Sequence, residues 1–178
     1  MPPVPLVDPT TIDTSRVLVD REGIRRANPQ RFEMEQLTAI VALVPEKHLI
    51  IGYKDVEADE FWVRGHLPDF PLMPGVLICE AAAQLSSYFF GQVIMLTGST
   101  FLGFGGMEDV RFRGPVRPGD RLVLVSQASR IHRRQTIFET QGFVKNNDEM
   151  NMVYHGRIIG VPLSNPDAKN GRRPESGR

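Results

Sequence analysis

Residues 65–89, GHLPDFPLMPGVLICEAAAQLSSYF, decide the fold that we expect for the chain. A loop rich in Gly, His, Pro and Asp leads into an apolar run. The pattern predicts a helix that begins at Pro74, where the missing N–H costs no hydrogen bond. Apolar residues lie on nearly every side of this helix, so it needs cover all round. One carboxylate, Glu80, stands inside the run.

The apolar run from Val76 to Leu96 approaches the length of a membrane-spanning helix. Polar residues interrupt it at several points around the helix, namely Glu80, Gln84, Ser86, Ser87 and Gln92. Because a membrane span tolerates such a mixture poorly, we predict a helix buried in a protein core and no membrane association.

Segments rich in β formers lie on both sides of this helix. Residues 37–45 and 47–56 predict two antiparallel strands joined by a turn, and FWVRG, residues 61–65, predicts a third short strand. Four further segments follow the helix: 107–114, 121–131, 135–145 and 150–160. We therefore predict an α+β fold, a curled antiparallel sheet wrapped around one long central helix, with a second copy of the chain completing the burial.

The two ends of the chain differ in composition from the domain between them. Four prolines fall within the first nine residues, so residues 1–19 are expected to form a flexible Pro-rich extension, and residues 162–178 a disordered tail. A single domain then spans residues 20–161. It opens with a short helix that Asp20 caps and that stops near Asn28.

The composition limits the partners and the compartment. The formal net charge is zero, and basic residues are not interleaved with aromatic ones, so binding to nucleic acid is not expected. The one cysteine, Cys79, cannot form an internal disulfide, which fits a reducing compartment. The N-terminus lacks the basic and apolar parts of a targeting signal, so we expect a cytoplasmic protein.

The start of the predicted helix is a candidate oxyanion hole. Gly75 has no side chain, so a ligand oxygen can approach the unpaired N–H groups of Gly75 and Val76, where the helix dipole favours negative charge. Gln84 lies one turn beyond Glu80 on the same face, and its amide can reach the carboxylate. A carboxylate in apolar surroundings is held by hydrogen bonds, protonated or facing a cavity, and the last two states suit an acid–base catalyst.

His66 is the natural counterpart of Glu80, because histidine takes up a proton near neutral pH. Taken singly, His66 is interpreted as a turn residue, and Glu80 is interpreted as a solvated helix residue. Together with amide donors at a helix start, they are the groups needed to remove a proton next to a thioester carbonyl and to expel a β-hydroxyl group.

Other candidates are weaker. Cys79 points away from Glu80 on the helix and is interpreted as a buried structural thiol rather than a nucleophile. His66, Asp69 and Glu80 lack the spacing of metal ligands, so no metal is expected. The remaining histidines fall in predicted strands: His48, His132 and His155. Three glycines lack the context of a phosphate loop and are interpreted as β-bulges or as a close approach of backbones: Gly103, Gly105 and Gly106.

The same stretch resembles the signature of a known family. Residues 65–68, residues 71–78, and Glu80-Ala81 with Gln84 resemble the FabZ-type β-hydroxyacyl-(acyl carrier protein) dehydratases of fatty acid synthesis, which have the hot-dog fold. A weaker likeness continues through residues 111–120, so that the resemblance spans about residues 20–161.

The resemblance implies a function and its residues. His66 and Glu80 would be catalytic, with Gly75, Val76 and Gln84 at the substrate, in the conversion of a (3R)-3-hydroxyacyl-(acyl carrier protein) to the trans-2-enoyl form. No metal or redox cofactor is implied, since the phosphopantetheine arm that holds the acyl chain belongs to the carrier. The family further implies a homodimer, often a trimer of dimers, whose sites each combine a histidine from one subunit with a glutamate from the other.

Two features of this chain bear on that expectation. Seven arginines are candidates for a basic patch on which an acidic carrier protein docks: Arg111, Arg113, Arg117, Arg121, Arg130, Arg133 and Arg134. The alternative is that they form a solvated, charged face of the sheet. Where the family commonly has Leu-Pro-His-Arg-Tyr-Pro, this chain has the sequence NPQRFE at residues 28–33, which puts the acyl preference in question.

Three other functions compete with the dehydratase. A hot-dog thioesterase would release free thiol, and an enoyl-coenzyme A hydratase would add water to coenzyme A thioesters. A non-catalytic acyl-binding hot-dog subunit would bind acyl chains without turnover, although the presence of both His66 and Glu80 argues against it.

Overall fold

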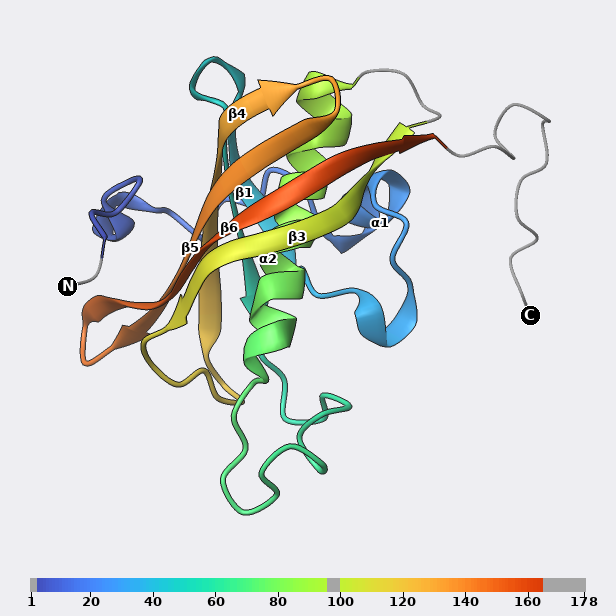
Figure 1. The fold of residues 1–178 in the computed structure, drawn as a ribbon. Helices are drawn as coiled ribbons and strands as arrows, with labels where there is room; N and C mark the ends of the chain where they lie inside the picture. Colours follow the sequence, from blue (N-terminus) through green and yellow to red (C-terminus); the bar gives the residue numbers. More distant parts are fainter. Residues whose placement is uncertain (1–2, 96–99, 165–178) are drawn as a thin grey trace.

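The computed structural model describes residues 3–95 and 100–164, and Figure 1 shows a sheet curled around one long helix, α2 (Gly75–Phe89). The described strands form one antiparallel sheet in the order β1-β2-β4-β5-β6-β3. They are β1 (Ala39–Val44), β2 (Leu49–Asp55), β3 (Thr100–Phe112), β4 (Arg121–His132), β5 (Gln135–Asn146) and β6 (Glu149–Ser164). The predicted α+β fold is therefore confirmed.

The central helix is covered on most sides. Leu85 and Phe89 are fully buried, and Phe89 meets Phe138 of β5 edge to face, with ring centroids 6.3 Å apart. Gly52 lets β2 approach the helix, since a Cβ atom there would lie 2.9 Å from the Cδ1 atom of Leu85. The helix passes into a π-helical turn at Phe90–Ile94. Among the described residues, no helix combines the length and the apolar character needed to cross a bilayer.

Both faces of the sheet are apolar in its middle strands. Ile50 and Leu124 pack in the core cluster that surrounds α2, whereas Ile51 and Val125 belong to a second cluster on the opposite, outer face, as the two-residue period of a strand requires. We call this second group the outer cluster; its buried members are Ala39, Leu49, Ile51, Tyr53, Val123, Val125 and Phe143.

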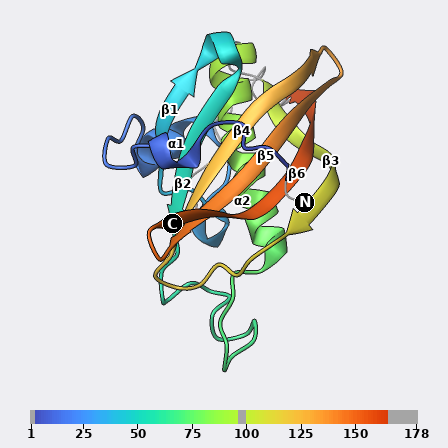
Figure 2. The ribbon, with the colours of Figure 1, turned by 90° about the vertical axis from the view of Figure 1, so that its left-hand side faces the viewer.

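The N-terminal segment covers the outer cluster. Figure 2 shows it crossing the outer face of β4 and β5. Leu6, Val7 and Ile12 pack against the cluster. The side-chain amide of Gln141 on β5 accepts a hydrogen bond from the Leu6 N–H at 2.8 Å and donates one to the Val4 carbonyl at 3.0 Å. The segment is thus a cover for apolar strands.

Several local predictions can be compared with the structure. A short helix, α1 (Arg21–Ala27), begins as expected, because the Asp20 carboxylate accepts a hydrogen bond from the Gly23 N–H at 2.8 Å. The β1–β2 hairpin is confirmed, with a 3₁₀ turn at Pro45–Lys47.

His48 was expected in a strand, but it ends this turn in the left-handed region, at φ 51°. The flexibility of residues 1–19 stays a prediction.

The disordered tail was expected over residues 162–178. Residues 162–164 belong to β6, and residues 165–178 lie outside the described residues.

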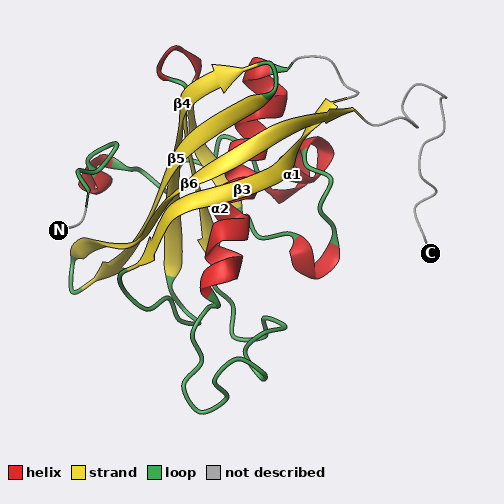
Figure 3. Ribbon diagram, viewed as in Figure 1, coloured by secondary structure: helices red, strands yellow, loops and turns green. Residues whose placement is uncertain are grey.

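The predicted strand at residues 61–65 is wrong. These residues form turns within the connection from β2 to α2, drawn as loop in Figure 3. Trp62 is 4% exposed and packs in the core, and its carbonyl accepts hydrogen bonds from the backbone N–H groups of Gly65 and His66. Because β2 is already paired with β1 and β4, the aromatic residues serve packing instead of a further strand.

The N-terminal cover can be tested by its contribution to stability. The double variant Leu6→Ser/Ile12→Ser is expected to lose about 1–3 kcal/mol of unfolding free energy, because two partly buried apolar side chains leave the outer cluster. Urea unfolding followed by circular dichroism measures the loss. Val4→Ser is the matched control, since Val4 is 86% exposed and should change the stability by less than about 0.5 kcal/mol. Equal stability of the two variants would contradict the covering role.

Candidate active site

The connection between β2 and α2 carries His66 and is tied down at both ends. Figure 1 shows this connection beyond the N-terminal end of α2. The backbone N–H groups of Val56 and Met73 donate to carbonyls of the connection between β3 and β4. Lys54 of β2 forms an ion pair with Glu60, and their side chains are only 6% and 12% exposed. The loop is therefore held against the sheet.

His66 is exposed, but its ring is oriented. The Nδ1 atom lies 2.8 Å from the carbonyl oxygen of Leu72. A carbonyl only accepts hydrogen bonds, so Nδ1 carries a hydrogen, and in the neutral ring Nε2 then bears the lone pair. The next residue, Leu67, has a φ of 58°, a strained value that turns the chain sharply after the histidine. This arrangement presents Nε2 as a base.

Glu80 is held from one side by Gln84. The Gln84 Nε2 atom donates to Glu80 Oε1 at 2.7 Å and to the Met34 carbonyl at 2.6 Å, and its Oε1 atom accepts from the Gln36 N–H at 2.9 Å. Gln84 is 2% exposed. All the hydrogen-bonding capacity of its Nε2 group is used, so the amide fixes the carboxylate. The same-face contact predicted from the spacing of Glu80 and Gln84 is present.

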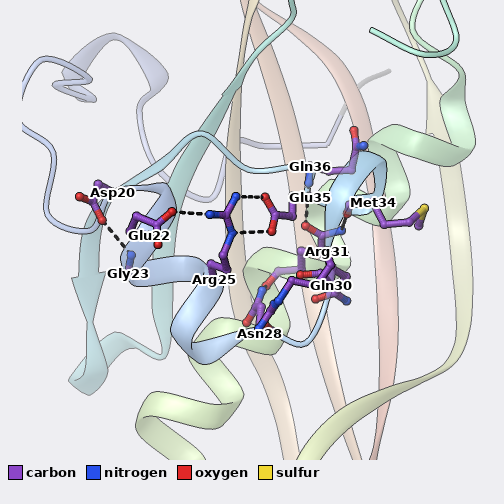
Figure 4. A network of polar contacts seen from close by, with 11 residues as sticks. Asp20, Glu22, Gly23, Arg25, Asn28, Gln30, Arg31, Met34, Glu35 and Gln36 are labelled. Carbon is purple, nitrogen blue, oxygen red and sulfur yellow. Dashed lines mark hydrogen bonds and ion pairs between the residues drawn. The ribbon is translucent and has the colours of Figure 1, made fainter. Parts of the chain in front are cut away.

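A segment outside the predicted catalytic and substrate-binding residues supports Gln84. Asn28 Nδ2 donates to the Gln84 carbonyl at 2.9 Å. Within the polar network of Figure 4, Arg25 of α1 forms two hydrogen bonds with Glu35, each 2.7 Å long. Residues 28–36 are thereby fastened behind Glu80. The sequence connected residues 28–33 with the acyl preference, but it gave no signal that they support Gln84.

The start of α2 differs by one residue from the prediction. Pro74 is the N-cap and Gly75 is the first helical residue, because Pro74 has an extended ψ of 132°. No side chain among the described residues caps this end, so first-turn N–H groups remain available. A Cβ atom at Gly75 would lie 2.6 Å from the Phe112 ring, which means that the glycine admits an aromatic ring of β3. Val76 is 67% exposed.

His66 and Glu80 have separate hydrogen-bond partners within one chain. Among the described residues, His66 bonds to Leu72 and Glu80 to Gln84, and no hydrogen bond joins the two. Glu80 faces a cavity of about 80 Å³ whose lining includes Gln30, Ala83 and Leu102 but not His66.

The other residues considered in the sequence have structural surroundings of their own. Cys79 is buried as predicted, and burial raises the pKa of its thiol, which keeps it protonated. His155 lies in β6 and accepts a hydrogen bond from Arg113 at 3.1 Å; burial is the main cause that lowers its pKa. The register of β3 against β6 shifts between Phe104 and Gly106, which is consistent with the irregular backbone predicted at these glycines. No group of three or more potential ligands in the described part of the chain could hold a metal ion.

The seven arginines do not form one patch. Arg121 opens the 12-residue strand β4 and pairs with Asp55 at 2.6 Å, whereas Arg130, Arg133 and Arg134 lie toward or beyond its far end. At the rise of an extended strand, the two ends are on the order of 35 Å apart. Arg117 lies near the first end, with its guanidinium 5.0 Å from the centre of the Phe70 ring.

The chain is similar to a known family model and to a curated protein. The family model of the FabA-like domain matches residues 28–155. The curated 3-hydroxyacyl-[acyl-carrier-protein] dehydratase FabZ of Francisella tularensis subsp. novicida (strain U112) is 34% identical over 151 residues, which cover 76% of this chain and 92% of that protein.

Solved structures show the same fold. The dehydratase heterocomplex ApeI:P from Xenorhabdus doucetiae superposes with a TM-score of 0.62 at 15% identity, covering 83% of this chain and 95% of that chain. A thioesterase from Haemophilus influenzae gives a TM-score of 0.54 at 15% identity, covering 72% and 79%. At such identities the likeness concerns the fold alone, and it defines a hot-dog protein.

The family follows from the sequence comparisons. The matched FabA-like domain spans most of the chain, and the FabZ relative aligns over nearly its whole length. The chain therefore belongs to the FabA-like family.

The Lys54–Glu60 ion pair should stabilise the connection between β2 and α2, which carries His66. Lys54→Met leaves the Glu60 carboxylate without its partner in a mostly buried place, and we expect a loss of roughly 3 kcal/mol of unfolding free energy. The double variant Lys54→Met/Glu60→Leu should recover most of it, because no charge is stranded. Thermal unfolding of the single and double variants measures the difference. A double variant as unstable as Lys54→Met would show that the pair does not act as a unit.

Proposed function

We propose that this protein is a hydro-lyase that converts (3R)-3-hydroxyacyl-(acyl carrier protein) to trans-2-enoyl-(acyl carrier protein) in fatty acid biosynthesis. The observation that carries the proposal is the 34% identity to a FabZ dehydratase across 92% of that protein. His66 on its tied loop and Glu80 on α2 supply a base and an acid. The thioesterase relative shares only the fold, so it gives no support to thioester hydrolysis.

His66 removes the proton from C2 of the substrate in this mechanism. Nε2 carries the free lone pair, and the Leu72 carbonyl, which accepts from Nδ1, stabilises the imidazolium that forms. The electrons of the broken C2–H bond form the C2–C3 double bond.

Glu80, protonated at the start, gives its proton to the 3-hydroxyl group. The C3–O bond breaks with its electron pair on oxygen, so water leaves and Glu80 becomes a carboxylate. The hydrogen bond from Gln84 stabilises that charge. Transfer of a proton from His66 back to Glu80, directly or through water, restores the starting state.

The first turn of α2 stabilises the thioester oxygen. As the C2 proton leaves, negative charge develops on this oxygen, and the N–H groups of Gly75 and Val76 lie at the uncapped, positive end of the helix. Gln84, buried behind Glu80, acts as a positioning residue. No cofactor of the enzyme takes part; the phosphopantetheine arm arrives with the carrier.

A homodimer joins the two catalytic groups. β3 lies at one edge of the sheet, and it exposes Phe104 and Met107, which are 56% and 45% accessible. The opposite edge, β1, is bridged by Val19. Pairing of two chains along β3 would cover these apolar residues and bring His66 of one subunit to Glu80 of the other. Three such dimers assemble into a hexamer in this proposal.

The acyl carrier protein docks beside the histidine loop. A groove of about 350 Å³ lies between the β3–β4 connection and the β5–β6 hairpin, with Arg113, Arg117 and Lys145 in its lining. An acidic carrier suits these charges. The enzyme works in the cytoplasm and needs neither a membrane nor nucleic acid.

The acid–base pair is tested by hydration of a crotonyl thioester, followed by the loss of ultraviolet absorbance. His66→Ala and Glu80→Gln should each lower kcat by about 10²- to 10⁴-fold, because each removes one proton transfer. Size-exclusion chromatography verifies that the variants keep the oligomeric state of the wild type.

Three outcomes would contradict this function. An inactive wild type that still binds acyl carrier protein would favour the non-catalytic subunit. Release of free thiol would favour the thioesterase. Turnover of coenzyme A substrates alone would favour the hydratase.

The docking groove is tested by charge reversal. Arg117→Glu/Lys145→Glu should raise KM for the carrier-bound substrate by about 10-fold at low salt, while kcat/KM for the coenzyme A thioester stays unchanged. Arg133→Glu, in the hairpin between β4 and β5, is the matched control. If the control raises KM as much as the double variant does, the carrier docks elsewhere or by net charge alone.

A further inference from the structure

The cavity at Glu80 contains a second group able to meet the substrate. Its lining is mostly apolar, with residues from α2, β3 and β6. The polar side chains in the lining are Gln30, Glu80 and Ser87. Of these, Gln30 comes from the connection between α1 and β1, far from Glu80 in the sequence. The fold therefore brings an amide and a carboxyl group to one small cavity.

The amide oxygen of Gln30 lacks a partner. It is buried, and no hydrogen bond reaches it in the described part of the chain. Three other buried polar atoms share this condition, but their residues, Gln36, Trp62 and Thr136, do not line the cavity. Since a buried, unpaired acceptor is costly, it indicates a place where a hydrogen-bond donor binds.

The position of Gln30 is fixed by its neighbours. Asn28 is anchored to the Gln84 carbonyl at 2.9 Å, one helical turn from Glu80. The guanidinium of Arg31 donates to the carbonyl of Asn28 at 2.8 Å and to that of Gln30 at 2.6 Å. Figure 4 shows Asn28, Gln30 and Arg31 gathered at this point. The backbone that carries Gln30 is thus held beside α2.

The carboxyl group of Glu80 complements this amide. Its Oε1 atom already accepts from Gln84, which leaves Oε2 for the cavity. A hydroxyl group needs two different partners when it becomes a leaving group: a donor to its oxygen, and an acceptor for the hydrogen that it already carries. Protonated Glu80 is such a donor, and the Gln30 oxygen is such an acceptor.

We propose that Gln30 binds the 3-hydroxyl group of the substrate, accepting its hydrogen while Glu80 protonates its oxygen. The inference rests on the proposed function and adds a second contact to the leaving group. When the C3–O bond breaks, the oxygen keeps the electron pair and leaves as water with one hydrogen of its own and one from Glu80. Gln30 neither gains nor loses a proton. In the reverse reaction it orients the attacking water.

The test separates hydroxyl recognition from packing. Gln30→Leu is compared with the wild type on a 3-hydroxybutyryl thioester, and inhibition is measured with a butyryl thioester, which lacks the hydroxyl group. We expect kcat/KM to fall by about 10- to 100-fold while the inhibition constant of the butyryl thioester stays within about twofold. The melting temperature should not fall, because no hydrogen bond reaches the lost oxygen from the described residues.

Two further variants sharpen the comparison. Gln30→His keeps a hydrogen-bond acceptor and should retain more activity than Gln30→Leu. Gln92→Leu makes the same change at an exposed position of the π-helical turn and should behave as the wild type.

The possible failures are distinguishable. An inactive wild type overturns the proposed function and, with it, this inference. An active wild type with an equally active Gln30→Leu variant overturns the inference alone. Equal weakening of hydroxybutyryl turnover and butyryl inhibition, or a large loss of melting temperature, overturns it in favour of a packing role.

Discussion

The need to cover α2 on nearly all sides governs the rest of the structure. Its buried residues, such as Leu85 and Phe89, cannot be sheltered by a flat sheet, so the strands curl around the helix. Close approach requires a glycine in β2, at Gly52. The curled sheet is in turn apolar on its outer face, where the N-terminal segment lies over it. The cover that one apolar helix needs thus accounts for the curled sheet and, through the outer face of that sheet, for the position of the N-terminal segment.

A polar group inside such a helix needs partners, and this requirement builds the site. Gln84 is buried, and its amide binds Glu80, Met34 and Gln36. These bonds join the Glu80 carboxylate to a segment about 50 positions away in the sequence, as the separations of 48 and 50 residues in the contacts of Gln84 show. The network fixes one oxygen of Glu80 and leaves the other to the cavity, which is the arrangement a general acid requires.

The sequence predicted those features that a short motif contains. The helix, the cap of α1 by Asp20, the Glu80–Gln84 contact and the buried Cys79 depend on spacing along one element, and all are present. The strand at residues 61–65 was wrong because Trp62 packs in the core, a contact that strand propensity does not reveal. The single arginine patch was not found because β4 separates its members. The catalytic roles themselves stay proposals.

The sequence by itself determined the α+β architecture and indicated a loop histidine and a helix carboxylate as candidate catalytic residues, since periodicity and motif spacing are local properties. Only the tertiary structure decided which side chains surround that carboxylate. The contacts of Gln30 and Gln36 could not be predicted, because neither spacing nor propensity encodes a contact between the α1–β1 connection and α2. It also gave His66 and Glu80 separate surroundings within one chain, because His66 lies before the helix start and Glu80 lines the cavity beside the helix.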